Sequence, residues 1–284
     1  MSNMFDMLQY PFAQHALVAA TLIAITCGLV APFVVMRDMA FAVHGTAELS
    51  FPSAVAGLLI ASDAVSGALV GSVVVATAFA VLGRRRSESN TAIGVVLAFG
   101  LGLGVFLLSF YDGFSSAATN ILFGSLVSAS TRDVLILGVL AVLVVVTMVV
   151  IFRPLLFASV DPAVATARGV PVQRLGLVFL LILALTVTEA AQVVGTLLVL
   201  SLAITPAAAA RRWTANPLAF TALSVLFALL AADGGFLLSL ALSDTDIKAS
   251  VLIAFVSFGI YLISFVAERV RGDVRRGSTQ PAAT

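Results

Sequence analysis

Residues 31–57, APFVVMRDMAFAVHGTAELSFPSAVAG, contain the two features that decide the fold. One apolar segment ends at the charged pair Arg37 and Asp38, and a second apolar segment follows at once. Within the second segment, His44 and Glu48 are four residues apart. On a helix, residues at this spacing share one face and are separated by a rise of roughly 6 Å.

An imidazole and a carboxylate on one face of a membrane helix need a polar environment. An ionised carboxylate alone in hydrocarbon costs about 3 kcal/mol or more, so such residues face a cavity or a partner. We therefore predict that His44 and Glu48 line the path of a divalent metal ion. Two alternatives remain open at this point: a structural hydrogen-bonded pair in a packed bundle, and a pH-sensitive gate, because histidine titrates near neutral pH.

The composition places the chain in a membrane. Of its 284 residues, 61% are hydrophobic and 10% are charged, whereas about 25% of the residues of a soluble globular domain are charged. We predict an all-α, multi-pass protein of the cell (cytoplasmic) membrane, with residues 1–284 forming one transmembrane domain surrounded by lipid. The single cysteine, Cys27, lies in an apolar run and is predicted to be a small core residue. No nucleic-acid partner is expected.

Nine apolar segments approach the roughly 20 residues that a spanning helix needs. The second and sixth are short enough to be broken or re-entrant, so we predict about nine spans and allow eight. Small residues in the seventh segment permit close helix packing, and Pro206 is predicted to kink that segment near its inner end. The segments are residues 12–36, 45–62, 65–83, 91–109, 132–152, 174–189, 192–210, 217–241 and 248–267.

The distribution of basic residues orients these segments. Cytoplasmic loops of membrane proteins carry an excess of Lys and Arg. If the run 84–86, which is Arg-Arg-Arg, is cytoplasmic, alternation of nine segments leaves only Arg132 and Lys248 of the fifteen Lys and Arg residues on the opposite side. The pattern predicts an N-terminus outside the cell and a C-terminus in the cytoplasm.

A short helix is predicted at about 161–169, in the cytoplasmic loop between two spans. Ser159 or Asp161 can cap it, and Pro162 suits its first turn. Gly169 then ends it, and Pro171 follows. We interpret this element as a coupling helix that docks on a cytoplasmic motor, and the alternative is an ordinary connecting turn.

Other polar positions are less specific. Asp233 interrupts an apolar segment beside two glycines, and we expect either a structural partner for it or, less readily, a place on the metal path. Glu189 and Gln192 are expected at an outer turn. In the outer loop, residues 117–127 are weakly amphipathic and suit a surface or half-inserted helix. The tail at about 272–284 is predicted to be disordered.

The order of several motifs resembles the membrane permease subunit of the metal-uptake ABC transporters, which import zinc, manganese or ferrous iron. The resemblance covers roughly residues 12–265. It is strongest in the last two of five motifs. These are FVVMRDMAF at 33–41, NTAIGVVLAFGLGLGVFLLS at 90–109, NILFGSLVSASTRDV at 120–134, DPAVATARGV at 161–170 and VVGTLLVLSLAITPAAAA at 193–210.

The resemblance implies properties that composition does not indicate. The permease is expected to be a homodimer with two cytoplasmic ATPase subunits and an external metal-binding protein that delivers the ion. The fold is expected to be similar to that of the vitamin B12-type importers, with fewer spans. The family's coupling helix matches Asp161, Pro162, Ala165 and Gly169 here.

The resemblance also bears on the metal site. Many family members carry an aspartate and then a histidine four residues later, where this chain has His44 and Glu48. Two subunits would supply two imidazoles and two carboxylates, a set that suits four-coordinate zinc, while manganese prefers more oxygen ligands. We therefore expect a divalent metal as the transported ion, Zn²⁺ first and Mn²⁺ or Fe²⁺ as alternatives, and no permanently bound cofactor.

A function of another class remains open. A proton-coupled secondary transporter working alone could use His44, Glu48 and Asp233 as a proton relay, but such a carrier needs no docking helix. The sequence contains no G-x-x-x-x-G-K-[ST] phosphate loop. ATP hydrolysis is therefore assigned to a separate chain, and this subunit is predicted not to be an enzyme.

Overall fold

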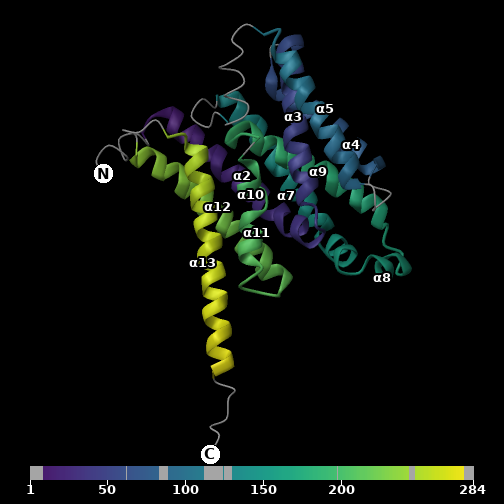
Figure 1. Cartoon of the computed structure of the whole chain (residues 1–284), viewed down its shortest axis with the longest axis vertical. Helices are drawn as coiled ribbons and strands as arrows, with labels where there is room; N and C mark the ends of the chain where they lie inside the picture. Colours follow the sequence, from purple (N-terminus) through teal and green to yellow (C-terminus); the bar gives the residue numbers. More distant parts are fainter. Residues whose placement is uncertain are drawn as a thin grey trace, which may run out of the picture.

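The chain folds into an all-helical bundle, as predicted, in the computed structural model described here (Figure 1). The structure describes residues 9–61, 63–82, 89–111, 124, 130–196, 198–242 and 247–277. The basic run at 84–86 lies outside these residues, and so does the 117–127 piece apart from Gly124.

Eight helices in the described part are long, and three are short. The long helices are α2 (Pro11–Met36), α3 (Ala40–Ala61), α4 (Ala64–Leu82), α5 (Ser89–Leu108), α7 (Thr131–Val160), α9 (Val172–Val194), α12 (Pro217–Ala241) and α13 (Ala249–Gly277). The short helices are α8 (Pro162–Ala167), α10 (Val199–Ala203) and α11 (Thr205–Ala210).

A tight turn separates α2 from α3. The N–H of Arg37 donates to the carbonyl of Phe33, and the N–H of Met39 donates to the carbonyl of Val34, both at 3.0 Å. Asp38 has a φ of 53°, the left-handed conformation that Asp tolerates better than most residues. Because the turn is so short, α3 begins at Ala40 and has 22 residues. The prediction that the second segment is short was therefore wrong.

The predicted sixth and seventh segments are divided differently in the structure. A single helix, α9, covers the whole sixth segment and the start of the seventh. It ends at Gly195, which has a φ of 96°, a conformation that favours glycine. The remainder forms α10 and α11, which are separated at Ile204 directly before Thr205 and Pro206. The predicted kink is thus a break, because Pro206 has no N–H to continue the helix.

Helix α2 occupies the centre of the bundle and runs antiparallel to both α9 and α12. Near the end of α2, the Phe33 ring lies 6.0 Å from that of Phe179, near the start of α9. In the first half of α2, the Thr21 hydroxyl donates to Asp233 in the second half of α12 at 3.0 Å. Since α9 and α12 therefore run in the same direction, residues 195–216 must return along the bundle between them, and they do so through α10 and α11.

Helices α3, α4 and α5 form a second group, seen side by side in Figure 1. Helices α3 and α4 approach so closely that a Cβ added at Gly57 would lie 2.5 Å from the Cα of Gly67. Leu49 of α3 lies over Gly100 of α5. The absence of side chains at Gly57 and Gly67 lets α3 and α4 pack backbone to backbone, and at Gly100 it leaves room for the Leu49 side chain.

Helix α13 packs against α12 and extends beyond the bundle (Figure 1). A Cβ added at Gly235 would lie 2.5 Å from the Cα of Ile253, so the two helices are in close contact. Arg212 forms an ion pair with Glu268 and donates to the Tyr261 hydroxyl at 2.8 Å. The helix continues to Gly277. The predicted disordered tail overlaps it over 272–277, and residues 278–284 lie outside the described part.

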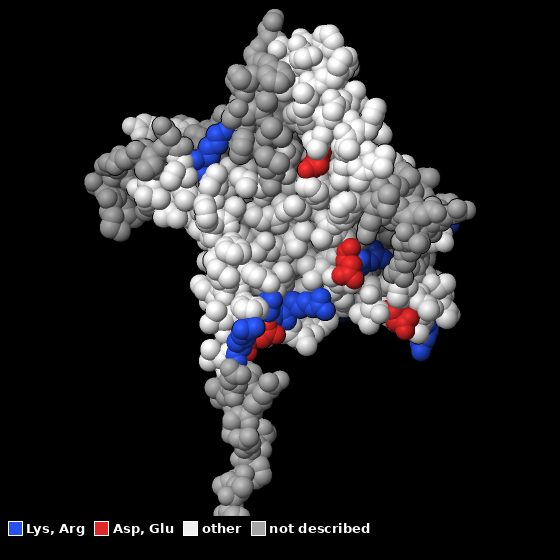
Figure 2. Space-filling model, viewed as in Figure 1, with Lys and Arg blue, Asp and Glu red and all other residues white. Residues whose placement is uncertain are grey.

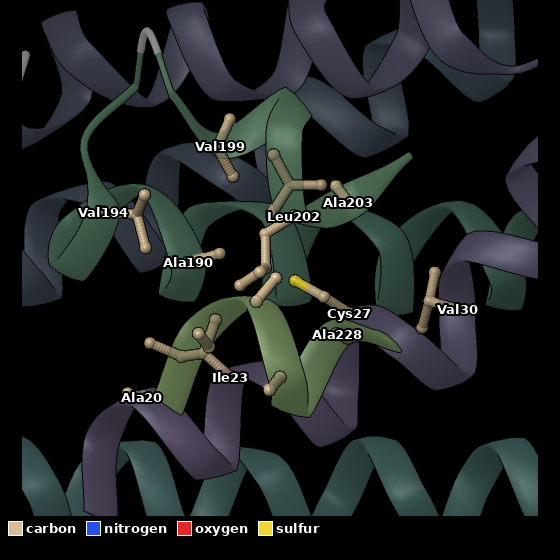
Figure 3. Close-up of a cluster of buried hydrophobic side chains, with 14 of the residues drawn as sticks. Ala20, Ile23, Cys27, Val30, Ala190, Val194, Val199, Leu202, Ala203 and Ala228 are labelled. Carbon is tan, nitrogen blue, oxygen red and sulfur yellow. The ribbon is translucent and has the colours of Figure 1, made fainter. Parts of the chain in front are cut away.

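The main core joins α2, α9, α10 and α12 with side chains of α3, α7 and α13, and most of its residues are small or aliphatic. Figure 3 shows Cys27 pointing into a cluster that includes Ala190, Leu202 and Ala228. Cys27 is buried, as predicted. Many of the buried core residues are alanines, and side chains this small allow the helix axes to approach closely.

The outer surface is apolar, with charges toward the ends of the helices. Five helices in the described part are long and apolar enough to cross a membrane by length and composition. In Figure 2 most charged atoms lie across the lower part of the molecule, and the broad middle is white. Arg132, at the start of α7, pairs with Asp63 at 3.0 Å, whereas Arg212 and Glu268 pair at the opposite end of the bundle. This arrangement is that of a multi-pass membrane protein.

Candidate metal path and coupling helix

His44 and Glu48 lie on α3 and contact each other. The Nε2 atom of His44 is 3.1 Å from Oε1 of Glu48, and the two side chains are 36% and 12% exposed. Helical spacing brings the two groups to the same face, one turn apart, as predicted. The pair offers an imidazole nitrogen and carboxylate oxygens, which are ligands for divalent transition metals.

The surroundings of the pair are intermediate between bulk solvent and a dry core. Helix α3 packs against α4, α5, α9 and α10. His44 is only four residues from the start of α3, close to the turn that contains Arg37 and Asp38. Its Nδ1 atom is buried and has no hydrogen-bond partner in the described part. The Nδ1 atom is therefore out of reach of a ligand in the single chain, although the side chain as a whole is 36% exposed.

Asp233 does not join this pair. Its Oδ1 atom accepts the hydroxyl of Thr21 at 3.0 Å, between α12 and α2. Within the described residues, no group of three or more His, Cys, Asp or Glu side chains is placed to hold a metal ion. One chain therefore offers two candidate ligands at α3, and a four-coordinate site built on them would need ligands from elsewhere.

Glu189 occupies an unexpected place. The sequence placed it at an outer turn, but it lies inside α9 with 1% of its surface exposed. Both carboxylate oxygens are without hydrogen-bond partners in the described part, and so is the Thr186 hydroxyl one turn earlier. Helix α9 packs against α2 in the bundle. This buried carboxyl group is the polar residue that sequence reasoning missed.

The reason for that error is local. The Glu189 and Gln192 side chains interrupt an apolar run, and the interruption was interpreted as the end of one span. The actual end of α9 is marked by Gly195, whose positive φ terminates the helix. Thr186 and Glu189, spaced i and i+3 among aliphatic residues, were the available signal for a buried polar face.

Helix α8 forms where the short helix was predicted. The Oδ1 atom of Asp161 accepts the N–H groups of Ala163 and Val164, each at 3.0 Å, and caps the helix. Pro162 occupies the first turn. The alternative cap, Ser159, instead donates to the Leu155 carbonyl within α7. The capping interaction explains why six residues form a helix between α7 and α9.

The far end of α8 is closed by glycine. Gly169 has a φ of 80°, and its N–H donates to the Thr166 carbonyl, while the N–H of Val170 donates to the Ala165 carbonyl. Ala165 is fully buried against the bundle, whereas Val164 is 44% exposed. Figure 1 shows α8 at the edge of the molecule. The helix is held on one side and presents its other side outward.

Comparison with known proteins places this geometry in a family. Residues 9–268 match the ABC 3 transport family. The manganese transport system membrane protein MntC of Halalkalibacterium halodurans is 29% identical over 281 residues, which are 97% of this chain and 95% of that protein. The high-affinity zinc uptake system membrane protein ZnuB of Haemophilus influenzae is 26% identical over 256 residues, 90% of this chain and 97% of that protein.

A solved structure has the same fold. PsaBC from Streptococcus pneumoniae, in complex with Fab, superimposes with a TM-score of 0.83 and 27% sequence identity. The match covers 93% of this chain and 95% of that chain.

Proposed function

Since this chain belongs to the ABC 3 transport family, we propose that it is the permease subunit of an importer that moves a divalent metal ion across the cell membrane. The observation that carries the proposal is the contact between His44 and Glu48, an imidazole and a carboxylate on one membrane helix. A permease of this kind is a transport path and not an enzyme.

The ion is proposed to pass between two copies of the chain. Each copy offers one imidazole and one carboxylate at α3, so two copies facing each other would supply two nitrogen and two oxygen ligands. In the single chain, the partial exposure of the His44 and Glu48 side chains supports this assignment, because a further ligand can reach the pair. Transport requires release of the ion, so the ligands are expected to bind it weakly and only transiently.

The transported metal is proposed to be Mn²⁺ or Zn²⁺, and Fe²⁺ stays as the third alternative. The ligand types alone favoured Zn²⁺, but relatives with similar coverage are named for manganese as well as for zinc. Manganese is therefore at least as well supported as zinc. Carboxylate oxygens from Glu48 suit Mn²⁺, and the imidazole of His44 suits Zn²⁺.

Nine passages through the membrane are proposed, one for each of the eight long helices and one for the broken pair α10 and α11. The antiparallel packing of α2 against α9 and α12 agrees with this count. With α8 in the cytoplasm, the turn at Arg37 and the ion pair of Arg212 with Glu268 are also cytoplasmic. The ion pair of Arg132 with Asp63 is then outside.

Helix α8 is proposed to transmit ATP binding and hydrolysis to the path. The exposed side of α8 would dock on an ATPase subunit, while buried Ala165 ties the helix to the bundle. Movement of α8 would pass directly to α7 and α9, which continue from its two ends. On the other side of the membrane, a separate binding protein would deliver the ion.

Metal uptake tests this function. Cells that lack their own manganese and zinc importers, and that express this chain together with an ATPase subunit and a metal-binding protein from the same organism, should accumulate Mn²⁺ or Zn²⁺ when that metal is limiting. Cells that express the ATPase and binding protein without the permease are the control. Equal accumulation of both metals with and without the permease would refute the proposal.

Co-purification separates this reading from a carrier that works alone. The permease should carry an ATPase subunit through purification in mild detergent, and uptake should stop when a phosphate-loop lysine of that ATPase is replaced. Uptake that persists without the ATPase and follows a proton gradient would instead indicate a secondary transporter.

A further inference from the structure

A groove on the outer surface lies between α2, α7 and α12. Its volume is about 770 Å³, within the range of roughly 300–1,000 Å³ that sites for small organic ligands occupy. It belongs neither to the His44 and Glu48 pair nor to α8. Its lining includes Val150, Arg153, Leu218, Thr221 and Ala222.

The groove faces the lipid bilayer. Val150 is 72% exposed and Leu218 is 68% exposed, although both are large aliphatic residues. Helix α7 is the most apolar of the candidate spans and the least buried within the protein. An exposed aliphatic surface of this kind on a membrane protein is covered by acyl chains.

One cation lies at the end of this apolar groove. Arg153 is on α7, 22 residues after Thr131, which corresponds to a rise of roughly 33 Å, slightly more than the hydrocarbon thickness of about 30 Å. Its guanidinium is therefore at the cytoplasmic interface when Thr131 is at the outer one. None of the ion pairs formed by the described residues involves Arg153. The other polar lining residue, Thr221, donates its hydroxyl to the Pro217 carbonyl.

We propose that this groove holds one anionic glycerophospholipid of the cytoplasmic leaflet, with an acyl chain between α7 and α12 and the phosphate group at Arg153. The aliphatic lining matches the chain, and the unpaired guanidinium matches the phosphate and an acidic headgroup. Basic pockets between membrane helices on the cytoplasmic side are suited to such lipids. The inference depends on the cytoplasmic placement of Arg153 and not on the transported metal.

Native mass spectrometry of the detergent-extracted complex tests the proposal. After exchange into equal amounts of phosphatidylglycerol and phosphatidylcholine, the wild-type chain should retain phosphatidylglycerol preferentially. In the Arg153→Gln variant, the ratio of retained phosphatidylglycerol to phosphatidylcholine should be about fivefold lower, since one basic residue near an anionic headgroup contributes a factor of this size. Arg153→Lys should keep most of it. Arg269→Gln is the matched control, because Arg269 is an exposed cation on α13 that does not line the groove.

A second variant addresses the acyl chain. Ala222 is exposed in the lining, and Ala222→Phe should fill the groove and lower retention of both lipids, with Ala222→Leu as the milder form if the first does not fold. A single gel-filtration peak confirms folding of each variant. Equal retention of the two lipids by the wild type, or an unchanged preference in Arg153→Gln, would overturn the proposal. Loss of self-association in Ala222→Phe with unchanged lipid retention would show that a second copy of the chain covers the groove.

Discussion

The His44 imidazole and the Glu48 carboxylate are in contact on α3, with the Nε2 and Oε1 atoms 3.1 Å apart. Each group therefore has a polar partner inside the bundle in the absence of a metal ion, which lowers the cost of keeping it there. In our proposal, an entering cation replaces this contact, and the pair acts as a weak, transient set of ligands that reforms after the ion leaves.

Removing the cap of α8 should weaken coupling to the ATPase. Asp161→Ala deletes the acceptor for two backbone N–H groups, and loss of such a cap costs about 1 kcal/mol, which a helix of six residues cannot absorb. We expect lower stimulation of ATP hydrolysis by the binding protein in a reconstituted complex. Asp161→Asn should retain most activity. Ser159→Ala is the control, since Ser159 bonds only within α7, and full stimulation in Asp161→Ala would contradict the assignment.

Gly169 should be sensitive to any side chain. Its φ of 80° is in the left-handed region, although no heavy atom lies within 4 Å of an added Cβ. Gly169→Ala should therefore cost about 1–2 kcal/mol through backbone strain alone, and coupling should fall as in Asp161→Ala. Gly138 on α7 is the control position. A Cβ added there also meets nothing within 4 Å, and the φ of Gly138 is not positive. Gly138→Ala should leave ATPase stimulation unchanged, and equal effects of the two variants would show that the turn is unimportant.

Close contact of α3 and α4 should make Gly57 intolerant of alanine. The added Cβ would lie 2.5 Å from the Cα of Gly67, so the helices must separate, at a cost of about 1–3 kcal/mol. We expect a lower melting temperature in detergent, measured by fluorescence-detected gel filtration. Gly102→Ala on α5 has open space around it and should match or exceed the wild type. An unchanged melting temperature in Gly57→Ala would contradict the described packing.

Glu189 should tolerate loss of its charge. Its buried oxygens have no partner in the described part, and a neutral isostere avoids burying an uncompensated charge. Glu189→Gln should therefore leave the melting temperature unchanged or raise it. Glu268→Gln is the control at an exposed ion pair, where the expected change is within about 1 kcal/mol. Clear destabilisation by Glu189→Gln would mean that the carboxylate binds a cation in the native protein.

Much of the architecture followed from local signals. The i, i+4 spacing put His44 beside Glu48, and the Asp161, Pro162 and Gly169 signals located α8 to within a residue or two. Helix bounds were less accurate, because hydropathy changes where polar residues begin, whereas α3 begins and α9 ends where turn geometry requires. The Asp38 turn sets the start of α3 and Gly195 sets the end of α9, through backbone conformations that composition does not reveal.

Contacts between distant segments were not predictable from the sequence. The hydrogen bond from Thr21 to Asp233 joins residues in α2 and α12, and apolar periodicity does not specify which helices become neighbours. The burial of Glu189, where α9 packs against α2, likewise depends on which helices become neighbours. The second copy of the chain, which the metal path requires in our proposal, adds contacts beyond those of a single chain.

The most direct measurement is metal uptake by His44→Ala and Glu48→Ala in cells that contain the ATPase and binding protein, at limiting Mn²⁺ and separately at limiting Zn²⁺. Leu59→Ala, at an exposed position on α3, is the matched control, and membrane levels of all variants are compared by immunoblot. We predict that both site variants lose most of the uptake of the transported metal, while Leu59→Ala transports like the wild type. Wild-type uptake by both His44→Ala and Glu48→Ala, at normal membrane levels, would contradict the claim that this pair lines the metal path.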